Sequence, residues 1–487
     1  MACSFELLNT LNRNLPKYEL FRQEELRDLH DASIEILERT GMVVVEDTCF
    51  RLLQDAGAVV DLASRVVKVP RYLVKEGIEK TPKGGRVHYG RTSKCDFMTG
   101  NGLFFRGGTL GPYVLDIRTG AHRPATKKDL EYLVRILDAM EGIQCVMFPC
   151  SPCDIPVESL SQQIAEVTLE NTTKPVGMVA FGRESARDII RMAALVAGGM
   201  EELTKRPIVQ LLCEPSSPLK LDQRQCENLV EFARHGLPLE MASMPAMCST
   251  APATYAGVIA QVNAEHLCMI LLAQLINPGT PVSLNACTGC IDPKTGLNSY
   301  GAVERVLLNA AVVQLWGSFY GLETYASAAL TDSKTHDEQA GYERMMNMLL
   351  PALAGVDMIT TLGYLESYLT ISPEQIVIDN EIADMIRKIL DGMEINQETL
   401  ATDVISKVGP GQHFLAQKHT LKHAGELFIP KIANRSTREE WKRRGEVDVA
   451  RVARQEAVRV LESHQPEPLE RGIQRGLHEI AVSKKTR

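Results

Sequence analysis

Residues 207–244 read PIVQLLCEPSSPLKLDQRQCENLVEFARHGLPLEMASM, and this stretch decides the fold. The apolar run Pro207–Cys213 predicts a buried strand, and Gln223–Arg234 then carries apolar residues at helical spacing. A second apolar run, Pro238–Met244, predicts the next strand. Strand, helix and strand in this order predict two parallel strands joined by a crossover helix.

The same alternation repeats along the chain from about residue 127. The other predicted strands are Ile143–Phe148, Pro175–Phe181, Pro281–Ala286, Ser318–Thr324 and Asp357–Thr361. The other predicted helices are Lys127–Met140, Leu160–Glu170, Ser185–Ala197, Thr254–Leu275 and Tyr300–Leu315. Seven strands can be recognised in this way, all with helical segments between them.

An eighth strand comes either from Leu103–Phe105 or from Val404–Val408. We therefore expect the α/β class and a (β/α)8 TIM barrel, with a doubly wound open sheet as the alternative. No G-x-G-x-x-G or G-x-x-x-x-G-K-[ST] motif occurs, which argues against a nucleotide cofactor.

The ends of the chain differ from the middle. We expect residues 1–100 to form an N-terminal extension of helices and short strands, residues 101–430 the barrel, and residues 431–487 a helical tail. Residues 435–487 hold 13 Lys+Arg against 9 Asp+Glu, in a chain of net charge -8. This basic tail either packs on an acidic body or docks an acidic partner.

Composition excludes several classes of protein. The chain has 487 residues, of which 45% are hydrophobic and 23% charged, as in globular proteins. The negative net charge argues against nucleic-acid binding. The apolar stretch Gly257–Ile276 is interrupted by polar residues, so we expect no membrane span. Twelve scattered cysteines and no signal peptide at Met1–Glu6 suggest a reducing cytoplasm.

Function in such a barrel belongs to the carboxyl ends of the strands. Glu214 follows Pro207–Cys213, and the predicted strand Ser318–Thr324 ends with Glu323 and Thr324 and is followed directly by Tyr325. Rings beside a carboxylate can hold a quaternary ammonium group; the other interpretation is that the rings fill the top layer of the core. The aromatic candidates near strand ends are Phe148, Phe181, Tyr325 and Tyr364.

Residues 335–338, Thr-His-Asp-Glu, form a capping box that predicts a helix start with Thr335 as N-cap. A helix N-terminus presents free N–H groups and the positive end of the dipole, which could bind a substrate carboxylate. In the other interpretation, His336 and Asp337 simply lie in the first turn of the helix and have no functional role. The sequence leaves both interpretations open.

Metal sites are weakly indicated. Cys150/Cys153 and Cys287/Cys290 are C-x-x-C pairs that could together give four thiolates to zinc. They lie far apart in the chain, whereas four-cysteine sites are usually compact, so we expect no metal. His419 and His423 lack the glutamate of H-E-x-x-H, so we expect a capping or core role for them.

Several segments together resemble the trimethylamine methyltransferase (MttB-like) superfamily from about residue 20 to about residue 445. They are residues 29–41, residues 116–126, Thr331-Asp-Ser-Lys through Gln339-Ala-Gly-Tyr342, Ile376–Glu381 and Val408–Phe414. The resemblance implies a TIM barrel that moves a methyl group from a methylamine to the cobalt of a separate corrinoid protein. It implies no tightly bound cofactor in this chain.

Archaeal trimethylamine enzymes of this superfamily carry pyrrolysine, expected near Asp332–Lys334, and this chain has only standard residues there. Members without pyrrolysine are similar to enzymes for quaternary amines: glycine betaine, proline betaine, carnitine or γ-butyrobetaine. The alternatives are trimethylamine itself, a non-catalytic betaine-binding or corrinoid-partner module, and a zinc-dependent thiol or methanol methyltransferase. We also expect a homo-oligomer.

A quaternary substrate needs positioning and charge rather than proton transfer. Arg106, a lysine or the helix start near residues 333–336 would bind the carboxylate of a betaine. The predicted catalytic residues are Glu323, Asp332 and His336. The predicted substrate-binding residues are Phe148, Glu214, Tyr325, Tyr364 and Arg106.

Overall fold

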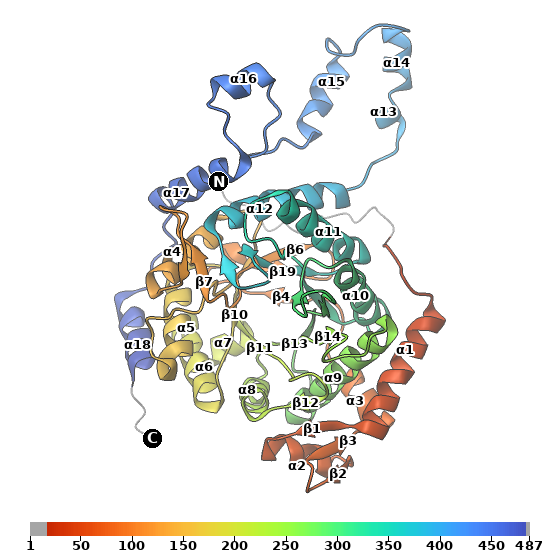
Figure 1. Ribbon diagram of the computed structural model, residues 1–487, viewed down its shortest axis with the longest axis vertical. Helices are drawn as coiled ribbons and strands as arrows, with labels where there is room; N and C mark the ends of the chain where they lie inside the picture. The colour runs from red at the N-terminus through yellow and green to blue at the C-terminus, as the bar shows by residue number, and fades with distance from the viewer. Residues whose placement is uncertain (1–16, 484–487) are drawn as a thin grey trace.

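The chain forms a closed barrel of eight parallel strands (Figure 1). The computed structural model describes residues 17–483, so the expectation for Met1–Glu6 lies outside the described residues. The barrel closes where β19 pairs in parallel with β6. The strands, in order around the barrel, are β6 (Phe104–Gly107), β9 (Cys145–Met147), β10 (Val176–Met178), β11 (Val209–Cys213), β13 (Leu239–Ser243), β15 (Val282–Ala286), β18 (Glu323–Ser327) and β19 (Met358–Leu362).

Two strand predictions are corrected. The eighth strand is β6, whereas Val404–Val408 belongs to a helix, α14 (Thr402–Val408). The strand predicted at Ser318–Thr324 is β18, which only begins at Glu323. The preceding helix runs on through a π-helical turn, η4 (Gln314–Phe319), whose Gln314 side chain accepts hydrogen bonds from two distant backbone N–H groups.

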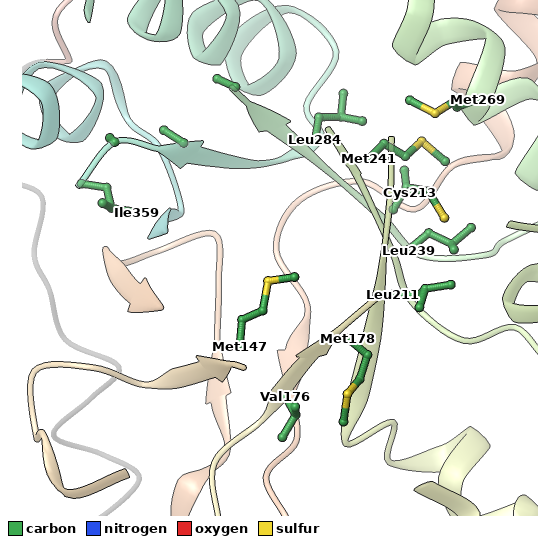
Figure 2. Close-up of a cluster of buried hydrophobic side chains, with 14 of the residues drawn as sticks. Met147, Val176, Met178, Leu211, Cys213, Leu239, Met241, Met269, Leu284 and Ile359 are labelled. Atoms are coloured by element: carbon green, nitrogen blue, oxygen red, sulfur yellow. The ribbon is translucent and has the colours of Figure 1, made fainter. Parts of the chain in front are cut away.

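Helices cover the outside of the barrel. Figure 2 shows part of the core beneath them, where Leu211, Leu239, Met241 and Leu284 lie together on neighbouring strands. The helices are α4 (Lys127–Ala139), α5 (Leu160–Asn171), α6 (Arg183–Ala197), α7 (Met200–Lys205), α8 (Gln223–Arg234), α9 (Tyr255–Ile276), α10 (Val303–Val313), α11 (Glu338–Ala354) and α12 (Pro373–Leu390).

Helix α9 is mostly apolar and is enclosed on all sides, and its polar side chains such as Asn263 and Glu265 are buried as well. Among the described residues it is the one helix long and apolar enough to cross a membrane, but 89% of its most apolar window is buried inside the protein. A helix that is hydrophobic all round and enclosed by other elements is a core helix. Its flanks pack against α1, α3, α8 and α10.

The N-terminal segment wraps one side of the barrel and also reaches beneath it. Its elements are α1 (Gln23–Glu35), η1 (Ile36–Thr40), β1 (Met42–Val44), α2 (Asp47–Asp55), β2 (Val59–Asp61), β3 (Val66–Lys68), α3 (Arg71–Lys80), β4 (Val87–His88), η2 (Ser93–Cys95) and β5 (Phe97–Met98). Strand β1 pairs with β12 (Lys220–Leu221) from a barrel loop. The hairpin β4–β5 lies at the amino ends of the barrel strands, where His88 contacts Glu323.

Short strands build a rim over the carboxyl ends of the barrel. One sheet joins β7 (Tyr113–Leu115), β8 (His122–Pro124), β20 (Tyr364–Leu365) and β21 (Thr370–Ile371). The other joins β14 (Ala246–Met247), β16 (Gly289–Ile291) and β17 (Asn298–Ser299). A single turn of 3-10 helix, η3 (Val157–Ser159), precedes α5.

After α12 the chain leaves the barrel and then returns (Figure 1). The excursion contains α13 (Gln397–Leu400), α14, α15 (Lys418–His423), η5 (Ala424–Glu426) and α16 (Arg438–Arg443). Helices α17 (Val449–Ser463) and α18 (Arg471–Val482) pack back on α12 and α5. Ion pairs such as Arg454–Glu374 at 2.6 Å join this tail to carboxylates of the barrel, as expected for a basic tail on an acidic body.

Candidate active site

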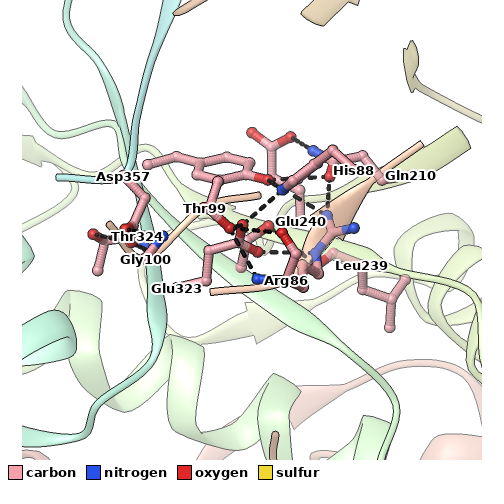
Figure 3. A network of polar contacts seen from close by, with 12 residues as sticks. Arg86, His88, Thr99, Gly100, Gln210, Leu239, Glu240, Glu323, Thr324 and Asp357 are labelled. Atoms are coloured by element: carbon pink, nitrogen blue, oxygen red, sulfur yellow. Dashed lines mark hydrogen bonds and ion pairs between the residues drawn. The ribbon is translucent and has the colours of Figure 1, made fainter. Parts of the chain in front are cut away.

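The lower half of the barrel is filled by a charged network rather than by aliphatic side chains (Figure 3). Glu323 is the first residue of β18 and contacts Arg86 at 2.9 Å and His88 at 2.7 Å. Burial alone would raise the pKa of Glu323, but the charges of Arg86 and His88 lower it to about 2. The expectation that Glu323 ends its strand at the mouth is wrong, because β18 starts later than the sequence pattern indicates.

Arg106 and Tyr325 lie inside the barrel above this network. The Arg106 guanidinium forms a bidentate pair with Glu240, with one hydrogen bond of 2.8 Å. Gln210 and Asn285 also donate to the Glu240 carboxylate, at 2.8 and 2.6 Å. Arg106 is 2% exposed, so its positive charge is neutralised by Glu240 inside the barrel and does not face a substrate carboxylate. The Tyr325 hydroxyl donates to Gln210 at 3.2 Å, and its ring is fully buried.

Phe148 and Tyr364 are also enclosed. Phe148 follows β9 and is part of the hydrophobic core. The Tyr364 hydroxyl accepts from the Thr109 backbone N–H at 2.6 Å and shares its single proton between the backbone carbonyl oxygens of Thr109 and Pro149. Both rings fill the top layer of the core, which was the other interpretation of the aromatic pattern.

Glu214 is the predicted site residue that does lie open at the mouth. It comes directly after β11 and is half-buried. Within the described part of the chain, its carboxylate makes no hydrogen bond or ion pair. Burial raises the pKa of Glu214 to about 7, with a further contribution from the Glu240 carboxylate below it. An unpaired acid held near neutrality is a common feature of functional sites.

Cys287 and Tyr300 lie within range of the Glu214 charge, and Tyr368 contacts both of them. The sequence pointed to Cys287 only as a possible zinc ligand and to neither tyrosine. Burial raises the pKa of Cys287 and of Tyr300, and the charge of Glu214 adds to both shifts. The Tyr300 and Tyr368 rings meet edge to face with centroids 4.8 Å apart. The Tyr368 hydroxyl is 3.1 Å from the Cys287 sulfur. We refer to Glu214, Cys287, Tyr300 and Tyr368 as the mouth cluster.

The loop that carries Tyr368 is strained. Glu366, Ser367 and Tyr368 have φ angles of 52°, 53° and 79°. Non-glycine residues adopt this left-handed region at a cost, and runs of them concentrate at functional sites. Tyr368 is therefore held in place by its surroundings rather than by local preference.

Asp332 provides much of that support. Its carboxylate accepts from the backbone N–H groups of Tyr300 at 2.8 Å and Gly301 at 3.0 Å. It also accepts from the hydroxyls of Ser299 and Ser367. Burial would raise the pKa of Asp332, but these donors lower it below its ordinary value. Asp332 thus braces both loops that present the tyrosines, which makes it a positioning residue.

His336 lies away from the mouth cluster. Its Nε2 is 2.8 Å from the Ser372 hydroxyl, which donates to Glu374, and Glu374 pairs with Arg454 of α17. The predicted capping box is also corrected: α11 starts at Glu338 and its N-cap is Asp337, whose carboxylate accepts from Ala340 N–H at 2.9 Å. An aspartate is a strong N-cap, so it displaces Thr335.

The cysteine pairs do not converge on a metal site. Across residues 17–483 no three His, Cys, Asp or Glu side chains approach closely enough to hold an ion. Cys150 is buried, Cys153 is exposed, and Cys287 contacts Tyr368 instead. The zinc-dependent alternative loses its support.

A closed (β/α)8 barrel with an unpaired acid and two tyrosines at its carboxyl mouth defines an α/β-barrel enzyme. The chain belongs to the trimethylamine methyltransferase (MTTB) family, whose model matches residues 2–487, and it is accordingly a methyltransferase. The family resemblance seen in the sequence motifs is confirmed.

Known relatives divide between two activities. Trimethylamine methyltransferase MttB of Desulfitobacterium hafniense (strain DSM 10664 / DCB-2) is 35% identical over 461 residues, which are 94% of this chain and 92% of that protein. Glycine betaine methyltransferase of Desulfitobacterium hafniense (strain Y51) is 32% identical over 430 residues, or 88% and 89% of the two chains. Identity alone therefore does not separate the two substrates.

Solved structures support the fold. The crystal structure of the Methanosarcina barkeri monomethylamine methyltransferase (MtmB) matches with a TM-score of 0.50 and 11% identity, over 92% of this chain and 96% of that chain. A hydroxylamine complex of MtmB matches with a TM-score of 0.51 and 12% identity, over 94% and 92%. At such identities the likeness shows the barrel fold alone.

Proposed function

We propose that this methyltransferase takes a methyl group from a quaternary ammonium compound and passes it to Co(I) of a separate corrinoid protein in the cytoplasm. The candidate donors are glycine betaine, proline betaine, carnitine and γ-butyrobetaine. The observation that carries the proposal is the unpaired Glu214 carboxylate, whose charge acts on Tyr300, together with the ring pair that Tyr300 forms with Tyr368. A carboxylate and aromatic faces together suit a cation that offers no hydrogen-bond donor.

The chemistry of this reaction requires little of the protein. Co(I) attacks the methyl carbon, the carbon–nitrogen bond breaks, and the electron pair stays on nitrogen as a neutral tertiary amine leaves. No proton has to be supplied, so positioning and electrostatics suffice. The positive charge disappears from nitrogen during the step, so a strongly ionised cage would stabilise the substrate more than the transition state. With a pKa of about 7, Glu214 carries only part of a negative charge near neutral pH, which limits this ground-state effect.

The carboxylate of a betaine requires a second contact. Arg106 is committed to Glu240, so we propose Lys334 for this role. Lys334 is exposed, and its ammonium donates to the Asp332 carbonyl at 2.7 Å, on the same segment that braces the two tyrosines. A betaine would then be held at both ends, by the mouth cluster and by Lys334.

Trimethylamine is the second candidate, favoured by the names of relatives such as MttB of Methanosarcina barkeri, which is 34% identical over 487 residues. Against it stands the absence of pyrrolysine from the Asp332–Lys334 segment. Trimethylamine needs activation before its nitrogen can leave, whereas a quaternary amine does not.

The test is methylation of free cob(I)alamin, followed by its absorbance, with the four quaternary amines and trimethylamine as donors. We expect turnover with at least one quaternary amine and none with trimethylamine. Lys334→Met should raise KM for that betaine and leave KM for tetramethylammonium unchanged. Turnover of trimethylamine alone would refute the proposed substrate class. Binding of a betaine without turnover, even with the corrinoid protein added, would favour a binding module.

A further inference from the structure

The excursion after α12 carries a surface that is unusual for a single soluble chain. We call residues 391–431 the arm; none of them is buried. Six of its apolar side chains are between 71% and 85% exposed: Met393, Ile395, Leu415, Leu421, Leu427 and Ile429. Clusters of exposed apolar residues mark interaction sites. In Figure 1 the arm projects beyond α12, away from the barrel.

A groove on the barrel side offers the matching surface. It has a volume of about 1000 Å³ and runs between α1 with η1 and the first turns of α9. Its lining is partly apolar, and four of the apolar residues are small; these residues are Leu29, Ala32, Ile36, Ala256, Gly257 and Ala260. Such a lining leaves room for large apolar side chains from another segment.

Parts of the two surfaces carry complementary charge. The groove lining holds Glu25, Asp28 and Glu35 with Arg39; Glu25 pairs with Arg22 and Glu35 with Arg39, so Asp28 carries the charge that is not already paired within the described lining. The arm as a whole holds four lysines against five aspartates and glutamates, but Lys407 and Lys418 lie in a stretch of it, residues 404–425, that has no acidic residue. Complementary charge of this kind guides association and sets its register.

The position of the arm argues for a second copy of this chain as its occupant. Helix α12 starts near the carboxyl mouth and, running antiparallel to the strands, ends at the opposite side of the barrel, where the arm begins. A protein that delivers cobalt must approach the mouth cluster instead.

We propose that the arm of one chain seats in the α1–α9 groove of a second copy, with Leu415 and Leu421 over the apolar part of the groove lining and Lys407 and Lys418 facing its acidic residues. Every chain carries both an arm and a groove. Reciprocal exchange therefore closes a symmetric homo-oligomer, of which the dimer is the simplest form.

The experiment measures the molar mass of the full chain by light scattering and sedimentation across a range of concentrations. The wild-type chain is expected at 107.6 kDa, which is twice its 53.8 kDa, or at a higher multiple. The double variant Leu415→Ser, Leu421→Ser should dissociate at least 100-fold more readily. Leu62→Ser, a change at a side chain that is 71% exposed outside both surfaces, should leave the mass unchanged.

Exchanging the charges of the arm and the groove tests which residues of the two surfaces face one another. Asp28→Lys with Glu35→Lys should weaken assembly, as should Lys407→Glu with Lys418→Glu, and combining all four should restore it. These side chains are exposed, so circular dichroism should show each variant folded. A monomeric wild-type chain, an oligomer indifferent to the arm or groove variants, or an arm that becomes protected only when the corrinoid protein is added would each overturn the proposal.

Discussion

Replacing Glu214 by glutamine removes the charge of the mouth cluster and keeps the shape of the side chain. The carboxylate has a pKa of about 7 and no partner among the described residues, so a bound cation is the group it would compensate. At a separation of about 5 Å and an effective dielectric constant of about 20, the attraction is roughly 3 kcal/mol. That energy corresponds to about a hundredfold in KM.

The expected effect is mainly on binding. Because the positive charge on nitrogen is only partly lost in the transition state, Glu214→Gln should raise KM about a hundredfold and raise kcat by a smaller factor. In the wild-type enzyme the carboxylate is ionised above about pH 7, so KM should rise as the pH falls below 7, by about tenfold per unit. The variant should lose this pH dependence.

The assay is initial-rate methylation of cob(I)alamin under anoxic conditions from pH 5.5 to 8.5, with the best quaternary amine as donor. Glu304→Gln is the matched control, because Glu304 is also half-buried and lies at the start of α10. A KM within threefold of wild type, or an unchanged pH profile in the variant, would refute the role assigned to Glu214.

Four further predictions concern the brace, the ring and the barrel interior. Tyr368→Leu should raise KM about fivefold and Tyr368→Phe hardly at all, because a cation–π contact of about 1 kcal/mol depends on the ring and not on the hydroxyl; the same kinetic assay decides it. Asp332→Ala removes four hydrogen bonds, so it should lower the free energy of unfolding, measured in urea, by about 4 kcal/mol. It should also raise KM, and an unchanged KM would show that Asp332 has a purely structural role. Arg106→Met leaves the Glu240 charge buried and should cost about 3–5 kcal/mol of stability, and a loss under 1 kcal/mol would contradict the ion pair. Glu323 has a pKa lowered from 4.5 to about 2, so its stabilisation is present above pH 4.5 and is lost as the pH falls towards 2; in acid titrations followed by circular dichroism, Glu323→Gln should flatten that part of the curve.

The sequence predicts the barrel well because the alternation of strand and helix is a local property. Each crossover helix follows its strand within a few residues, so Pro207–Cys213 and Pro238–Met244 predict β11 and β13 almost residue for residue. The strand predicted at Ser318–Thr324 fails because η4 is held by hydrogen bonds from Gln314 to the N-terminal segment, nearly 300 residues away in the chain. No local pattern contains that contact.

The candidate site was only partly predictable for the same reason. Glu214 follows a strand directly, so strand periodicity is enough to find it. Tyr368 lies in a loop whose positive φ angles depend on the Asp332 brace, and Tyr300 is brought to the mouth by the same carboxylate. Residue type and spacing identify Asp332 as noteworthy, but only the three-dimensional contacts show that it supports the tyrosines.

The hairpin beneath the barrel has a consequence for how the chain is made. Arg86 and His88 leave the ribosome 237 and 235 residues before their carboxylate partner, Glu323. At translation rates of about 5–20 residues per second, these two side chains wait roughly 10 to 50 seconds for that partner. The N-terminal hundred residues can therefore adopt their final arrangement only after most of the chain has been synthesised. Until β18 is made, Arg86 and His88 have no Glu323 carboxylate to pair with, and the amino-terminal end of the barrel stays open.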